Sequence, residues 1–203
     1  MGIVAAMLHA RLHLDAAAMT HSLDSALSTP IPTPSLAARY LRVDHAGEFG
    51  AIQIYRAQIL VGRWLGRPSV GLLEDFLSHE RRHLATFDEI LAARGIRRCR
   101  SFLWCGVGGY ALGLITALLG ERAVMACTRS VETVVNHHLE EQLAHMAHSD
   151  PDAHAAVASI VHDELEHRDV AAERVGRDDA LTRGIDTVVA ASTEAVIRLG
   201  MRL

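Results

Sequence analysis

One spacing of glutamate and histidine occurs twice in this 203-residue chain. A lone glutamate is followed 32 residues later by the tetrapeptide Glu-x-x-His, and the whole arrangement is then repeated. Residues i and i+3 lie on one face of an α-helix, one turn apart, so each tetrapeptide directs a carboxylate and an imidazole at the same point. The residues are Glu48, Glu80 and His83 in the first copy, and Glu132, Glu164 and His167 in the second.

This repeat predicts a metal centre inside a bundle of four helices. Four carboxylates and two imidazoles are the ligand set of the dinuclear carboxylate proteins with a ferritin-like fold. Burying four carboxylates together without cations is prohibitively costly, and two divalent metal ions remove that objection. We therefore expect two ions, iron or manganese, bound by all six of these side chains.

The rest of the sequence also favours helices. Half of the residues are hydrophobic but only 4% are aromatic, and no strand-like alternation of any length appears. The expected fold class is all-α: a ferritin-like four-helix bundle with an apolar crossover helix and a C-terminal helix. The bundle helices are predicted over residues 36–62, 68–94, 121–149 and 151–174, and the last amphipathic stretch over 178–203.

The crossover is predicted at an uncharged run of 18 residues, Phe102 to Leu119. Its length is borderline for spanning a bilayer, and Arg97, Arg98 and Arg100 precede it, which suits anionic lipid headgroups. We expect a helix that lies on the membrane surface or forms a wall of an apolar substrate tunnel, in preference to a true membrane span. A plain buried helix is the alternative.

Composition limits the other possibilities. The net charge of -4 gives no indication of a nucleic-acid partner. The three cysteines, Cys99, Cys105 and Cys127, form no C-x-x-C motif, which argues against a disulfide framework and favours a reducing compartment. Residues 1–36 read as a poorly ordered N-terminal arm, and residues 37–203 as one bundle domain.

The same residues permit other functions. His79-Glu80-Arg-Arg-His83 matches H-E-x-x-H, the helix of zinc hydrolases, in which His79 and His83 would bind zinc and Glu80 would act as the base. That hypothesis leaves Glu48, Glu132 and the second Glu-x-x-His unexplained. A ferroxidase of the ferritin or rubrerythrin type and a membrane-surface scaffold with vestigial ligands are further alternatives.

Three residues are candidates for supporting the metal ligands. A metal-bound imidazole usually donates its other N–H to a carboxylate or a carbonyl. Asp163 directly precedes Glu164 and is placed to accept from His83 on the facing helix, and Asp44 lies one turn before Glu48. Surface caps or salt bridges are the alternative roles for both aspartates. The third candidate is His138.

Several phrases in order along the chain resemble the demethoxyubiquinone hydroxylase family of ubiquinone biosynthesis. The resemblance covers about residues 39–203, and its most specific phrases are Asp-His-Ala-Gly-Glu and Asp-Glu-Leu-Glu-His. The matching segments are Arg42-Val-Asp-His-Ala-Gly-Glu-Phe-Gly50, Glu80-x-x-His83, Thr116-Ala-Leu-Leu-Gly120, Ala126-Cys127-Thr128, Val131-Glu132, His137-His138 and Asp163-Glu-Leu-Glu-His167.

This resemblance implies a specific activity. The family consists of membrane-associated di-iron monooxygenases that hydroxylate the ring of a polyprenylated ubiquinone precursor, with O2 as co-substrate and NADH as the electron source. It implies that the six side chains of the repeat are the iron ligands. For a bacterial member it also implies a peripheral location on the cytoplasmic side of the cell membrane, and partner proteins from ubiquinone biosynthesis.

One position departs from the family pattern. A tyrosine commonly follows the second histidine of the His-His pair, whereas this chain has Leu139 after His138. In the family this tyrosine is thought to help electrons pass between reductant, quinone and metal. Its replacement leaves three routes open: another tyrosine such as Tyr55 or Tyr110, a changed reductant, or a slower enzyme. No G-x-G-x-x-G fingerprint for a dinucleotide is present.

Overall fold

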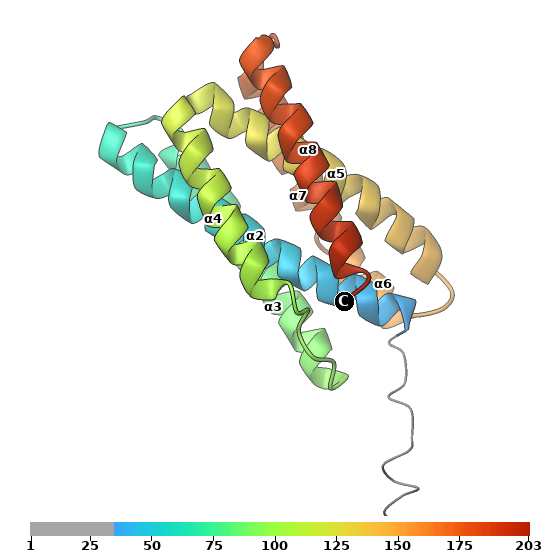
Figure 1. Ribbon diagram of the computed structural model, residues 1–203. Helices are drawn as coiled ribbons and strands as arrows, with labels where there is room; N and C mark the ends of the chain where they lie inside the picture. Colours follow the sequence, from blue (N-terminus) through green and yellow to red (C-terminus); the bar gives the residue numbers. More distant parts are fainter. Residues whose placement is uncertain (1–34) are drawn as a thin grey trace, which may run out of the picture. The chain divides into compact units, whose positions relative to one another are not determined.

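The computed structural model describes residues 35–203, and within that range the chain is helical with no strand (Figure 1). Residues 1–34, which make up most of the predicted N-terminal arm, lie outside the described residues. The predicted all-α class is confirmed. The helices are α2 (Leu36–Leu65), α3 (Val70–Ala93), α4 (Phe102–Leu119), α5 (Glu121–Met146), α6 (Pro151–Ala158), α7 (Val161–Val175) and α8 (Ala180–Gly200).

Four of these helices form the bundle. Helix α2 packs on α3, and α5 packs on α7, so each half of the repeat forms a helix pair (Figure 1). Helix α8 covers α5, and α4 lies along α2. Each pair brings one lone glutamate and one Glu-x-x-His into the interior, where both helices also bury apolar side chains.

The long helix α2 has clear signals at both ends. The side chain of Ser35 accepts a hydrogen bond from the backbone N–H of Ala38 at 3.1 Å, which caps the first turn. At the other end Gly66 adopts φ 63°, the left-handed conformation that ends many helices and suits glycine best. The helix therefore extends three residues beyond the predicted end at Gly62.

The crossover helix α4 packs very closely on α2 through glycine. A Cβ atom on Gly109 would collide with the backbone oxygen of Gly50, and one on Gly113 with that of Ile54. The opposite side of α4 carries large apolar side chains that are exposed. These are Leu103, Trp104, Val107, Ile115, Leu118 and Leu119, each more than half exposed.

The fourth bundle helix differs from its prediction. The apolar pattern over 151–174 predicts one continuous helix, but the structure has α6 and α7 with a short turn between them. At the turn the N–H of Ile160 bonds to the carbonyl of Val157, three residues back, in place of the usual fourth. Neither Pro nor Gly marks this turn, so the sequence carries no local signal for it. Helix α7 consequently begins at Val161, and Glu164 lies in its first turn.

Candidate metal centre

The six side chains of the repeat meet in the bundle interior in two overlapping groups. One group contains Glu48 and His83, the other contains Glu132 and His167, and both groups contain Glu80 and Glu164. Within each group one potential ligand atom per residue lies within 4.8 Å of all the others. The two groups therefore share the carboxylates of the Glu-x-x-His tetrapeptides, and each lone glutamate belongs to only one group. Each group corresponds to one potential metal position.

The centre is buried and tightly packed. All six side chains are at most 6% exposed. His83 Nδ1 lies 2.8 Å from Glu164 Oε1 and 3.6 Å from Glu48 Oε2. His167 Nδ1 lies 3.2 Å from Glu80 Oε1. The two imidazoles thus present the same ring atom, Nδ1, to the carboxylates.

Unpartnered atoms show that these residues fit a metal pair. His83 Nδ1, His167 Nδ1 and Glu80 Oε1 are buried atoms that make no hydrogen bond of normal geometry within residues 35–203. Buried polar atoms are rarely left without a partner, since this costs about 1–3 kcal/mol each. Divalent ions bound by carboxylate oxygen and imidazole nitrogen would satisfy all three. The cluster is therefore compatible with iron.

The electrostatics of the centre without metal are strained. Burial raises the pKa of Glu80 and of Glu132 well above the usual value, and the carboxylate of Glu164 raises both further. Burial lowers the pKa of His83, but Glu164 and Glu48 outweigh it and raise that pKa to about 10. At His167, in contrast, burial prevails and lowers the pKa to about 4. The carboxylates are too crowded to be charged together without cations.

The outer nitrogen of each imidazole has a hydrogen-bond partner on the facing helix. His83 Nε2 lies 3.1 Å from Asp163 Oδ2, in the position expected from the sequence. Asp163 also accepts from Arg82 at 3.3 Å. His167 Nε2 lies 3.1 Å from His79 Nδ1, and the two rings are stacked.

This contact bears on the zinc-hydrolase alternative. An H-E-x-x-H zinc site needs His79 and His83 to converge on one ion. Here His79 belongs to neither convergent group and approaches the outer nitrogen of His167, whereas Glu80 belongs to both groups. The arrangement favours Glu80 as a ligand and His79 as a partner of a ligand.

The other two candidates make no hydrogen bond to the six side chains among the described residues. Asp44 Oδ1 accepts from Gln142 Nε2 at 2.8 Å, and His138 Nε2 pairs with Glu194 Oε2 at 2.7 Å. Burial raises the pKa of Asp44 to about 8, although the bond from Gln142 acts in the opposite direction. Asp44 and His138 line the same cavity as the carboxylates of the centre.

Tyr55 is a polar contact that the spacing analysis missed. Its hydroxyl donates to Glu132 Oε1 at 3.4 Å, and the side chain is only 2% exposed. Tyr55 follows Glu48 by seven residues, which is two helical turns, so it shares a face with that ligand. This spacing was the available signal for its position in the interior.

A cavity of about 270 Å³ connects the centre with α4 and α8. The carboxylate residues Glu48, Glu80, Glu132 and Glu164 are part of its lining. The remaining lining is mostly apolar, and it includes α4, as expected for a tunnel wall. The apolar residues include Ile54, Trp104, Leu112, Val131, Val135 and Ile197.

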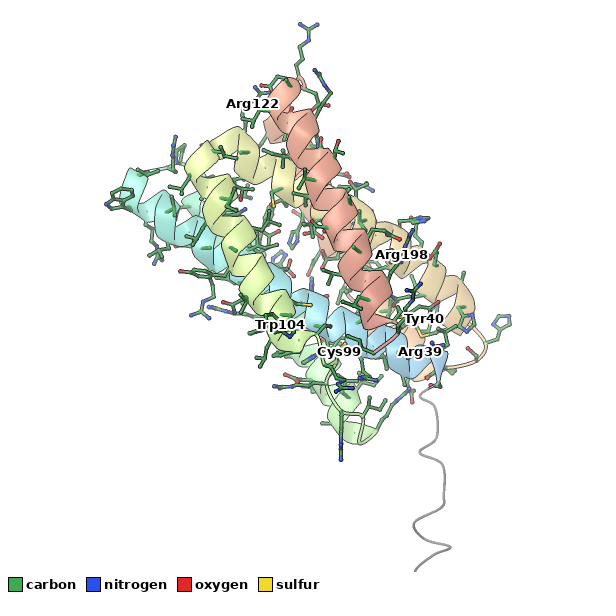
Figure 2. The ribbon with its side chains drawn as sticks, viewed as in Figure 1. Arg39, Tyr40, Cys99, Trp104, Arg122 and Arg198 are labelled. Atoms are coloured by element: carbon green, nitrogen blue, oxygen red, sulfur yellow. The ribbon has the colours of Figure 1, made fainter. Side chains whose placement is uncertain are left out.

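A second pocket, of about 340 Å³, adjoins the first at the end of the bundle. The two pockets share Val43, His138, Gln142 and Ile197. The second is lined by three arginines, and Figure 2 shows two of them near Tyr40 at this end of the molecule. They are Arg39, Arg198 and Arg202.

Comparison with known proteins agrees with these observations. The profile of the family described as ubiquinone biosynthesis protein COQ7 matches residues 35–200. A 3-demethoxyubiquinol 3-hydroxylase from Rhodospirillum rubrum is 44% identical over 143 residues, which cover 68% of this chain and 66% of the relative. The bovine NADPH-dependent 3-demethoxyubiquinone 3-hydroxylase is 34% identical over 170 residues, 81% of this chain and 77% of the relative.

The human protein with the same description as the bovine one gives the same identity and coverage. The profile match includes all six convergent side chains and both histidine partners. The resemblance seen in the sequence is therefore confirmed, and with it the hydroxylase class. This chain belongs to the COQ7 family of ubiquinone biosynthesis proteins.

Proposed function

We propose that this chain hydroxylates the ring of a polyprenylated demethoxyubiquinone, or of its quinol, at a di-iron centre. One observation carries the proposal: a largely apolar cavity leads directly to four carboxylates that converge with two imidazoles. The family relationship supplies the reaction class. A ferroxidase would need no apolar cavity at its metal centre.

The six convergent side chains would hold the iron pair. Their four carboxylates balance the charge of two ferrous ions, and each Nδ1 is directed inward as a ligand must be. When bound, the irons supply the activation of O2 that ring hydroxylation requires. Glu80 and Glu164 would serve both ions, because each belongs to both groups.

The cavity walls would position the ring and exclude water. Val131, Val135 and Ile54 lie beside the carboxylates, and Leu112 of α4 continues the apolar wall. A planar ring held between such side chains faces the metal centre without a hydration shell. The prenyl tail would follow the apolar side of the cavity toward α4 and α8.

The electrons would come from a nicotinamide nucleotide. The names of the mitochondrial relatives specify NADPH, and the sequence resemblance implies NADH. The arginine-lined pocket suits its phosphates, since guanidinium groups bind phosphate oxygens strongly. This pocket shares four lining residues with the cavity that would hold the ring (the ring cavity), so the reductant and the ring would bind next to each other. Leu139 is buried and lines the ring cavity, where the family commonly has tyrosine.

The proposed location is the cytoplasmic side of a bacterial cell membrane, with α4 on the lipid surface. By length and composition α4 is long enough to cross a bilayer. Its glycine face, however, is occupied by α2, which supports a peripheral helix whose other face meets lipid. Proteins of ubiquinone biosynthesis would meet the enzyme at the same surface.

Isotope labelling tests the reaction. The purified chain is loaded with Fe²⁺ under anaerobic conditions and mixed with NADH, a short-tailed demethoxyubiquinol analogue and ¹⁸O2. Mass spectrometry should detect one ¹⁸O atom in the ring. Glu164→Ala should give no product, whereas His137→Ala is the matched control, since His137 is largely exposed. Iron oxidation without ring product would favour the ferroxidase alternative.

Vesicle flotation tests the location. The chain should float with vesicles that contain anionic lipid, and the double variant Leu103→Glu/Leu118→Glu should remain at the bottom. The control Leu181→Glu alters an exposed leucine on α8 and should float as the parent does. If all three proteins stay equally in the bottom fraction, apart from the vesicles, the proposed membrane surface on α4 is contradicted.

A further inference from the structure

His79 is the one member of the H-E-x-x-H motif that the proposed centre does not use as a ligand. It directly precedes Glu80, and Asp163 directly precedes Glu164 in the second half. Each of these two residues contacts the histidine of the opposite half, at 3.1 Å in both cases. His79 and Asp163 therefore occupy equivalent places with different chemistry.

The inward direction of Nδ1 determines which atoms carry protons in the metal-bound state. A nitrogen that binds metal has no proton, so the proton of His167 must be on Nε2 and is donated to His79 Nδ1. His79 would accept this bond through the lone pair of a ring nitrogen. By the same argument His83 donates from Nε2 to Asp163, which is a carboxylate.

We propose that His79 is a positioning residue for His167, and that its ring nitrogen, a weaker acceptor than the carboxylate of Asp163, makes the metal position of His167 the weaker of the two. A partner that accepts from the outer N–H fixes the imidazole and raises its strength as a ligand, and a carboxylate does so more than a neutral acceptor. The inference rests on the proposed di-iron function.

A second contact acts in the same direction. Tyr55 donates to Glu132, which belongs only to the group of His167. A hydrogen bond into a carboxylate withdraws charge from the oxygen that would bind the metal. Glu48, the matching ligand of the His83 group, receives no hydrogen bond from a tyrosine among the described residues. Both differences therefore predict tighter metal binding in the group of His83 than in the group of His167.

Three variants separate the contributions. Asn Oδ1 is attached to Cγ just as His Nδ1 is, so His79→Asn places an uncharged acceptor at the same number of bonds from Cβ. His79→Leu removes the acceptor. Asp163→Asn replaces the charged acceptor of His83 by a neutral one and gives the two halves the same kind of partner.

The experiment is an anaerobic titration of the metal-free chain with Co²⁺, followed by visible absorption and calorimetry. The parent should bind two ions in steps of unequal affinity. His79→Leu should weaken the weaker step about 10- to 100-fold and leave the stronger step within about threefold. His79→Asn should restore the parent titration. Asp163→Asn should weaken the stronger step and so reduce the difference in affinity between the two steps.

The outcomes distinguish this inference from the function on which it rests. If the parent binds fewer than two ions, the dinuclear function fails. If the parent binds two ions but His79→Leu changes neither step, or weakens both equally, the role of His79 fails alone. Circular dichroism of each metal-free variant checks folding, and His79→Ala replaces His79→Leu if the leucine variant does not fold.

Discussion

Glu80 lies in the middle of α3, whereas its counterpart Glu164 lies in the first turn of α7. Burial raises the pKa of Glu80, but at Glu164 the contacts with His83 and Glu132 outweigh burial and lower the pKa. The positive end of a helix dipole also favours a carboxylate in the first turn. Identical spacing in the two halves therefore does not give the two shared carboxylates the same charge preference.

The two halves differ again at a tyrosine. Tyr55 follows Glu48 by seven residues and reaches Glu132, but the position seven residues after Glu132 is Leu139. Leu139 is 2% exposed and packs in an apolar cluster with Phe87 and Met146. The first half thus supplies a phenol partner to the lone glutamate of the second half, whereas the matching residue of the second half packs among apolar side chains.

The largest expected effect distinguishes shared from single ligands. Glu80→Ala and Glu164→Ala should each abolish binding of both metal ions, because each residue belongs to both groups. Glu48→Ala and Glu132→Ala should each reduce binding to one tight ion per chain. The affinity loss should exceed the roughly 100-fold that a partner of a ligand gives. Metal analysis after anaerobic loading measures the stoichiometry, and equal losses in all four variants would contradict the sharing.

The next effect is the pH dependence of the metal-free protein. The pKa of Asp44 is raised to about 8 in the folded protein. Its contribution to stability is complete when the pH is below the pKa of Asp44 in the unfolded chain, and it is lost as pH rises through 8. Glu80, Glu132 and His83 also have raised pKa values and act in the same direction. Stability should therefore fall between pH 6 and pH 8, by about 2 kcal/mol from Asp44 alone.

Denaturant unfolding at the two pH values measures this change. His167, with a pKa lowered to about 4, stabilises the fold more as pH rises through 6.5, so it offsets part of the decline near pH 6 and none of it near pH 8. Metal ions bind the deprotonated groups and should remove the decline or reverse it. A metal-free protein that gains stability from pH 6 to pH 8 would show that the buried carboxylates are charged without metal.

A smaller effect concerns the helix caps, which differ between α6 and α3. Asp150 caps α6 through the N–H of Ala153 and pairs with both terminal nitrogens of Arg94, at 2.6 and 2.8 Å. Ser69, at the start of α3, makes no such cap. Asp150→Ala should destabilise the fold by about 1–2 kcal/mol. Chemical denaturation measures this, and Asp152→Ala, an exposed neighbour, is the control.

The smallest effect is expected at the tyrosine. Tyr55→Phe removes one hydrogen bond and should cost about 1 kcal/mol of stability. It should also tighten the weaker Co²⁺ step slightly, because Glu132 regains charge. Leu139→Tyr is the complementary change, which gives the second half a phenol. If Tyr55→Phe instead weakens Co²⁺ binding, the main effect of the hydroxyl is to orient Glu132 as a ligand, and its withdrawal of charge from the carboxylate is the smaller effect.

The sequence predicted the helices and the convergence of six side chains because both follow from helical periodicity and from the 32-residue spacing. It did not predict the turn between α6 and α7, since neither Ser159 nor Ile160 is a helix breaker. The contact of His79 was readable in principle, because His79 and Asp163 hold the same place before their glutamates. The cavity was only partly predictable, since its shape depends on how closely α4 packs on α2.

A Mössbauer spectrum of the chain loaded with ⁵⁷Fe²⁺ and then exposed to O2 tests the dinuclear centre most directly. Two irons that share Glu80 and Glu164 should be magnetically coupled, and the oxidised sample should show a diamagnetic ground state at low temperature. Uncoupled, paramagnetic ferric iron as the main species would contradict a shared centre.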